Sequence, residues 1–137
     1  MAPPARVAQR FDESEWPFVV VKLSPRQLTD QEFLEELDCI SALYRRGQRF
    51  GLVVDTRAAP QPSTQRRRQI AARMDQDITR YPGLHIGTAI VASSALTRGA
   101  FKALMWLRQT QEPPLQTFAD VESGLQWLRA LQRKPSL

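Results

Sequence analysis

Short apolar runs alternate along the chain with longer segments in which apolar residues recur every three or four positions. The short runs cover residues 18–21, 50–54, 86–92 and 115–119, and β-branched side chains are prominent in the first three. Such runs, bounded by turn residues, predict short strands. The run 50–54 stops at Asp55 and has helical patterns on both sides, so it is predicted to be a strand buried on both faces at the centre of a parallel sheet.

Four segments with helical periodicity separate or follow these runs. The first opens with Thr29 and Glu32, the spacing of a capping box, and Gly47 is the expected stop. The expected N-caps of the other helices are Ser63 or Thr64, Ser93-Ser94, and Asp120. This alternation predicts an α/β domain with a single small sheet of about four mostly parallel strands, joined by right-handed crossovers.

The length of 137 residues fits one domain, and 42% apolar residues are enough for a real core. Residues 1–14 are expected to form a flexible arm, residues 15–132 the domain, and residues 133–137 a basic tail. No apolar run is long enough to span a bilayer, and no leader segment is evident. Cys39 is the only cysteine, which excludes an internal disulfide and fits a reducing compartment. The expected location is the cytoplasm.

The net charge is +5, and arginines crowd the middle third of the chain. A basic flank of the second helix is formed by Arg66, Arg67, Arg68 and Arg73. This flank is a candidate surface for anionic lipid or an acidic protein face, and the alternative is a solvated basic surface. Aromatic residues do not interleave with it and no DNA-reading motif occurs, so no DNA partner is expected.

A candidate anion or phosphorylation site lies where the central strand ends. Ligand sites in open α/β sheets gather at the carboxyl ends of strands, which is where Asp55 and Arg57 stand. The next helix begins at Ser63 or Thr64 and would offer free backbone N–H groups. The same edge should hold Ser93, Ser94 and Arg98. The alternative is that Asp55 pairs with Arg57 and the serines only cap helices.

The third helix is apolar around much of its circumference. Ala100, Leu104 and Leu107 share one side of it, Trp106 points well away from that side, and Phe101 and Met105 form a second apolar shoulder. Such a helix either packs deeply or contacts another chain, and Trp and Met are favoured at interfaces. We therefore take Phe101, Met105 and Trp106 as a candidate partner-binding surface, with packing on a neighbouring helix as the alternative.

Catalytic and metal-binding patterns are weak. Cys39 lies in the middle of a helix, and His85, the only histidine, is expected in a turn. One Cys and one His cannot form a zinc site, and neither a nucleophile elbow nor a phosphate-binding glycine loop occurs. We expect no cofactor and no metal, and an enzyme is the weakest of the three functional interpretations.

The order of elements and several segments resemble the SpoIIAA-like (STAS-related) family. The segments are 50–55, 86–91 and 118–128, and the last is the most specific, with a strand Phe, an acidic cap and a helix ending in Trp-Leu. The resemblance covers roughly residues 16–131. It implies a small sheet with helices mostly on one face and a non-enzymatic signalling or binding role. Relatives with a related fold hold lipids.

In the founding branch of that family, a serine at the start of the helix after the central strand is phosphorylated. Ser63 or Thr64 occupies this position, but the Asp-Ser-Ser-Gly pattern of that branch is replaced by Gln-Pro-Ser-Thr-Gln at residues 61–65. The leading hypothesis is a signalling or scaffolding module that acts by protein–protein interaction, including homodimerisation. The alternative is peripheral binding of an anionic lipid or small ligand. The sequence does not reveal whether the fold encloses a cavity.

Overall fold

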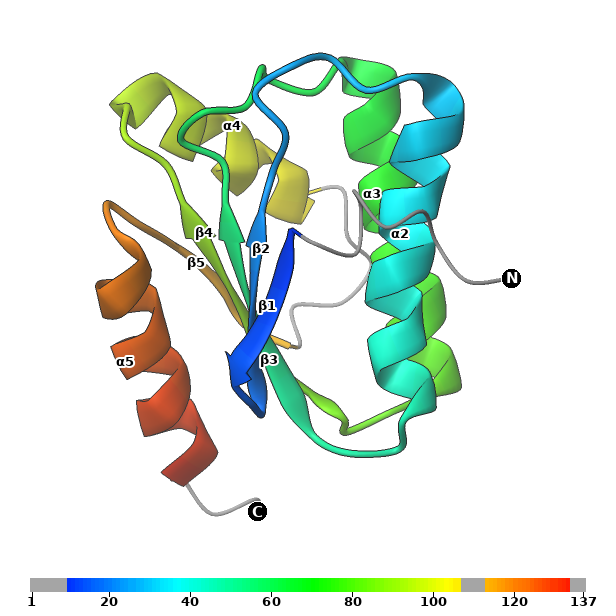
Figure 1. Ribbon diagram of the computed structural model, residues 1–137, viewed down its shortest axis with the longest axis vertical. Coiled ribbons are helices and arrows are strands. Elements are labelled where there is room, and N and C mark those ends of the chain that lie inside the picture. The colour runs from blue at the N-terminus through cyan, green and yellow to red at the C-terminus, as the bar shows by residue number, and fades with distance from the viewer. Residues whose placement is uncertain (1–9, 107–112, 134–137) are drawn as a thin grey trace.

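One five-stranded sheet organises the protein, whose computed structural model describes residues 10–106 and 113–133 (Figure 1). The strands are β1 (Phe11–Glu15), β2 (Phe18–Lys22), β3 (Phe50–Asp55), β4 (His85–Val91) and β5 (Leu115–Phe118). They lie in the order β1-β2-β3-β4-β5. β1 runs antiparallel to β2, and the other neighbours are parallel. The predicted α/β class and the central position of β3 are therefore confirmed.

The helices lie on both sides of this sheet. Those of the described residues are α2 (Asp30–Arg45), α3 (Thr64–Arg80), α4 (Ala95–Trp106) and α5 (Val121–Arg133). α2 and α3 cover one face and α5 covers the other (Figure 1). α4 contacts α3 and β5. Right-handed crossovers between successive parallel strands place their connecting helices on the same side, so only the terminal helix α5 reaches the opposite face.

The strand count and the start of the domain differ from the prediction. β1 begins at Phe11, inside the segment 1–14 that was expected to form an arm. It pairs with β2 through Phe11 and Val21, and only its first residue is partly buried. A polar edge strand of this kind has no apolar periodicity, so the sequence does not reveal it. Residues 1–9 and 134–137, which include most of the expected arm and tail, lie outside the described residues.

The helix boundaries follow the predicted capping signals. Thr29 and Glu32 form the capping box, and Gly47 follows α2 with a positive φ of 72°. Ser63 is the N-cap of α3, where its hydroxyl accepts from the backbone N–H of Arg66 at 3.1 Å. Ser94 and Asp120 accept equivalent bonds at the starts of α4 and α5. α4 is described as far as Trp106.

The face under α5 is closely packed. Leu125 and Leu128 of α5 join Val53 and Ala89 in one buried cluster. Two glycines of the sheet, Gly51 and Gly87, lie beneath Leu128. A Cβ atom at Gly51 would come within 3.1 Å of Leu128 Cδ2. Glycine at this position therefore allows α5 to approach the sheet closely.

Candidate functional site

A cavity of about 160 Å³ lies between the sheet and the helices α2 and α3. Its walls are largely apolar and come from β3, β4 and β5, from the segment that follows β2, and from both helices. The main apolar residues are Leu23, Leu37, Ile40, Leu52, Val54, Ile70, Met74, Ile90 and Leu115. Ligand sites are typically concave and mostly apolar with a few placed polar groups, so this cavity is the leading candidate site of the described residues.

One end of the cavity lies at the carboxyl ends of the strands. Ser24, Thr56 and the Pro-rich loop 59–62, which leads from β3 to α3, line this end. Gln61 Nε2 donates to Thr97 Oγ1 at 3.2 Å and so ties the loop to the first turn of α4. The sequence presents this loop only as a connection, but in the folded chain it borders the cavity.

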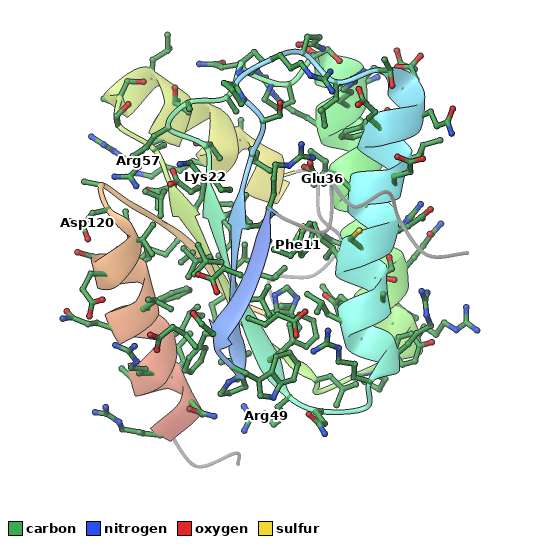
Figure 2. All side chains as sticks on the ribbon, in the orientation of Figure 1. Phe11, Lys22, Glu36, Arg49, Arg57 and Asp120 are labelled. Carbon is green, nitrogen blue, oxygen red and sulfur yellow. The ribbon has the colours of Figure 1, made fainter. Side chains whose placement is uncertain are left out.

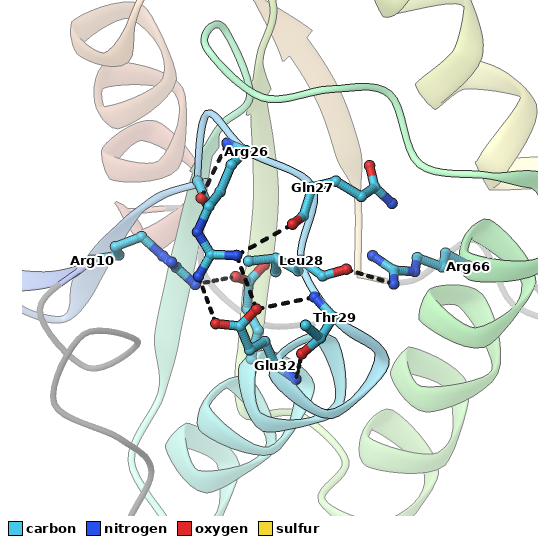
Figure 3. Close-up of polar contacts among 9 residues, drawn as sticks. Arg10, Arg26, Gln27, Leu28, Thr29, Glu32 and Arg66 are labelled. Atoms are coloured by element: carbon cyan, nitrogen blue, oxygen red, sulfur yellow. Dashed lines mark hydrogen bonds and ion pairs between the residues drawn. The ribbon is translucent and has the colours of Figure 1, made fainter.

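α2 and α3 are joined to each other by a polar seam along the cavity. Arg66 Nη2 crosses from α3 to donate to the carbonyl oxygen of Leu28 at 2.8 Å (Figure 3). It also donates to Asp30 Oδ1 at 3.0 Å. Arg73 Nη1 donates to Asp38 at 2.8 Å. Buried Ser41 donates its hydroxyl hydrogen to Asp77 Oδ2 at 2.7 Å. These contacts join α2 directly to α3.

The start of α2 carries a second polar cluster at the cavity rim. Arg26 donates from both terminal nitrogens to Glu32, at 3.0 and 2.6 Å (Figure 3). Glu32 also accepts from the backbone N–H of Thr29 in the capping box. The charge of Arg26 is therefore already matched by an acid.

Four arginines line the cavity, and only one of them has no acidic partner among the described residues. Arg26, Arg66 and Arg73 are paired with Glu32, Asp30 and Asp38. Arg67 makes no ion pair, and its buried Nε atom has no hydrogen-bond acceptor. The expected basic surface is thus divided, because Arg66, Arg67 and Arg73 are partly buried beside the cavity and only Arg68 is exposed.

The other end of the cavity is formed around His85, which is a buried residue of β4 and does not lie in the turn expected from the sequence. The Tyr44 hydroxyl bonds His85 Nδ1, and the ring of Phe50 stacks on the imidazole at 5.1 Å. Nε2 lies 3.1 Å from the carbonyl oxygen of Gly87 and 3.0 Å from Thr88 Oγ1. Because a carbonyl can only accept, Nε2 carries the hydrogen and Nδ1 accepts from Tyr44.

An irregularity in β4 explains why His85 and Thr88 share one face. Phe50 pairs with His85, but Leu52 pairs with Thr88, so β4 has one extra residue in this stretch. Strict alternation would place residues 85 and 88 on opposite faces. An extra residue of this kind re-aims side chains, and here it directs both polar groups toward the cavity.

Two buried acids also line the cavity. Glu36 pairs with Arg10 at 2.8 Å and lies on the side of α2 that faces the sheet (Figure 2). Burial raises the pKa of the Glu36 carboxyl, and the nearby Arg10 opposes this increase. Burial likewise raises the pKa of Asp77, against the hydrogen bond from Ser41. Anionic forms of these two side chains are therefore disfavoured inside the fold.

Asp55 and Arg57 of the predicted anion site at the end of β3 bond to each other. Asp55 accepts from Arg57 Nε at 3.0 Å and from Nη2 at 2.9 Å, and these bonds hold the pKa of Asp55 below its usual value. Alternation along β3 places Asp55 on the α5 side with Val53, where Lys22 and Asp120 lie at the same end of the sheet (Figure 2). Asp55 and Arg57 are therefore directed away from the cavity.

The serines of that predicted site begin α3 and α4 on the other side. The Ser63 hydroxyl is the N-cap of α3, and Thr64 is the exposed first residue of that helix. Ser94 caps α4, next to exposed Ser93, and Arg98 donates to the carbonyl oxygen of Ala92 at 3.1 Å. The structure therefore does not combine these residues with Asp55 and Arg57 into one site.

The candidate partner surface on α4 is only partly described. The backbone is helical through Phe101, Met105 and Trp106, but these three side chains lie outside the described residues. Earlier in the same helix, Leu96 is 78% exposed, and Gly99 and Ala103 are also exposed.

Comparisons with protein-family models, curated proteins and solved structures found no match. The resemblance to the SpoIIAA-like family therefore stays a prediction. Within residues 10–106 and 113–133, no group of three or more His, Cys, Asp or Glu side chains could hold a metal ion. Over the same ranges, every helix is too short or too polar to cross a membrane.

Proposed function

We propose that this protein is a non-enzymatic binding domain that holds a small, mostly apolar molecule between the sheet and the helices α2 and α3. The observation that carries the proposal is the cavity itself. The opposite face of the same sheet is filled, and protein interiors are normally packed with few voids larger than a water molecule. A space of about 160 Å³ with apolar walls is therefore an exception that a bound molecule would explain.

The cavity volume limits the size of this molecule. An engineered apolar cavity of about 150 Å³ in another protein stays dry and binds benzene. The present cavity has nearly the same volume, is partly open to solvent, and is lined at one end by the loop 59–62. We therefore propose a ligand with one aromatic ring or a short aliphatic chain, which has a polar end near the loop 59–62.

The polar groups of the cavity support binding more than bond-making. A general base must reach the proton that it removes. Both ring nitrogens of His85 are already hydrogen-bonded within the protein, to Tyr44 and to the Gly87 carbonyl. Asp55, at the end of the central strand, is held by Arg57 on the other side of the sheet.

Binding of a neutral probe, 3-phenylpropan-1-ol, tests the proposal directly. Titration into isotope-labelled protein should shift the backbone amide resonances of Leu52, Met74 and Ile90, which line the cavity. Leu125 and Leu128 of α5 serve as internal controls and should not move. Absence of any shift at millimolar probe, or shifts centred on α5, would contradict the proposal.

A second candidate function is protein–protein interaction through α4, including self-association as a signalling or scaffolding module. The exposed Leu96 supports it, because Gly99 and Ala103 continue the same exposed side of the helix at steps of three and four residues. The mass of the protein in solution tests it: a dimer at micromolar concentration should dissociate in the Leu96→Asp variant. A monomer at every concentration would leave homodimerisation without support.

A further inference from the structure

We propose that Arg67 binds an anionic head group, so that the ligand of the cavity is a small amphiphile with a carboxylate or phosphate at one end. This inference rests on the binding function proposed above and specifies its ligand. The head would lie at the carboxyl end of the strands, near the loop 59–62. The apolar body would extend toward Leu52 and Ile90.

The position of Arg67 on α3 is unusual for an arginine. Ile70, Ala71 and Met74 form the apolar side of α3 that packs toward the sheet. Arg67 lies three, four and seven residues before them, so it continues the same side by one turn toward the start of the helix. A charged residue at such an inward position is rarely buried unless it is paired.

The comparison with the other cavity arginines isolates Arg67. Arg26, Arg66 and Arg73 each have an acid within 3.0 Å. Arg67 has none among the described residues, although its Nε atom is buried and without an acceptor. A guanidinium group offers parallel N–H donors that match a carboxylate or a phosphate, so an anionic ligand would supply the missing acceptor.

The charges around the cavity favour this orientation of the ligand. Arg67 lies in the first turn of α3, where the helix dipole favours an anion. The buried acids Glu36 and Asp77 also line the cavity, and neither offers positive charge to an anion. The head is therefore directed to Arg67, and the apolar body occupies the rest of the cavity.

Three probes that share one aromatic body test the inference: 3-phenylpropionate, 2-phenylethyl phosphate and the neutral 3-phenylpropan-1-ol. In calorimetric titrations, at least one anion should bind about 10- to 100-fold more tightly than the alcohol, as expected for a charge-assisted hydrogen bond. The anion with the higher affinity identifies the head group. Arg67→Gln should remove this preference and leave the affinity for the alcohol nearly unchanged.

Matched variants separate this site from general basic attraction. Arg68 is the exposed neighbour on α3, and Arg68→Gln should retain the full preference for the anion. Arg67→Lys keeps the charge but loses the parallel donors, so this variant should retain only part of the preference for the anion. Amide spectra of each variant without probe establish that the fold is unchanged, and Arg67→Lys provides the test if Arg67→Gln does not fold.

The possible results distinguish the two proposals. If the alcohol binds but neither anion binds more tightly, the assignment of Arg67 is wrong while the binding function stands. The same conclusion follows if Arg68→Gln removes the preference as fully as Arg67→Gln does. If none of the three probes binds, both proposals are wrong.

Discussion

The two faces of the sheet are packed in different ways, although the same strands supply both. On the α5 face, Leu128 lies directly over Gly51 and Gly87, and the buried residues of the helix are apolar or glycine. On the α2 and α3 face, the helices bury polar residues such as Glu36, Ser41 and Asp77. This face also contains the cavity.

The difference follows from the kind of side chain that each helix turns inward. The apolar residues of α5 stabilise the fold only by contact with the sheet, so that helix packs as closely as the glycines allow. Inward polar groups of α2 and α3 need hydrogen-bond partners, and they find them in each other, as Ser41 and Asp77 do. A helix pair joined by its own polar seam can leave space above the sheet, which is the space where we propose that a ligand binds.

The strongest test of this difference compares two leucines on helices. Leu128 of α5 is fully buried, whereas Leu37 of α2 borders the cavity. Leu128→Ala should lower the free energy of unfolding by about 4 kcal/mol, because it opens a new void in a filled region. Leu37→Ala should lower it by only about 2 kcal/mol, because that side chain already lacks neighbours on one side. Urea unfolding measures both values.

Equal losses in the two variants would mean that the two faces are packed alike. The Leu-to-Ala change has the same intrinsic effect on helix propensity in both helices, so it cancels in the comparison. An unchanged dependence of the free energy on urea concentration provides the control that neither variant alters the unfolded state.

Smaller effects on the free energy of unfolding are expected at two neighbouring valines of β3, and the two effects should have opposite signs. Val53 is fully buried under α5, and Val54 faces the cavity. Val53→Ile adds a methyl group where no space exists and should lower the free energy of unfolding by about 1 kcal/mol. Val54→Ile adds the same group toward empty space and should raise it by about 1 kcal/mol. Thermal and urea unfolding measure both changes in free energy. The two variants lie on one strand and carry the same chemical change, so each is a control for the other.

Local signals in the sequence account for the parts of the fold that were predicted. The capping box at Thr29 and Glu32, the stop at Gly47 and the cap at Ser63 depend on residues within one helical turn, so their pattern is sufficient. The central position of β3 follows from its apolar run and from the helices around it. β1 was missed because Phe11 is its only apolar residue.

The candidate site was mostly not predictable, because it depends on distances between elements. Apolar periodicity shows which side of a helix faces inward but not how far the helix stands from the sheet. The extra residue in β4 that aligns His85 with Thr88 also leaves no pattern in the sequence. Arg67 is different: its spacing from Ile70 and Met74 already placed it on the inward side of α3. That spacing was available, but the neighbouring arginines favoured interpretation as a basic surface.

The smallest predicted difference concerns the pH dependence of two aspartates on opposite sides of the sheet. Hydrogen bonds from Arg57 lower the pKa of Asp55 in the folded protein, whereas burial raises the pKa of Asp77. In the unfolded chain both carboxyl groups should titrate at about 3.9. The stability from Asp55 is therefore present above that value and lost as the pH falls through the lower folded pKa. Folded Asp77 binds a proton more readily than unfolded Asp77, so its contribution to stability falls as the pH rises toward the raised folded pKa.

Asparagine variants measured between pH 2 and pH 7 should separate these two contributions. Asp55→Asn should be least stable relative to the native chain at pH 7, by at most about 1 kcal/mol, because Arg57 is partly exposed. Asp77→Asn keeps an oxygen that can accept from Ser41, so its stability relative to the native chain should improve from low pH to pH 7. If Asp77→Asn instead loses stability relative to the native chain as the pH rises, as Asp55→Asn should, then the carboxylate beside the cavity is not disfavoured, and the contrast between the two faces does not extend to their electrostatics.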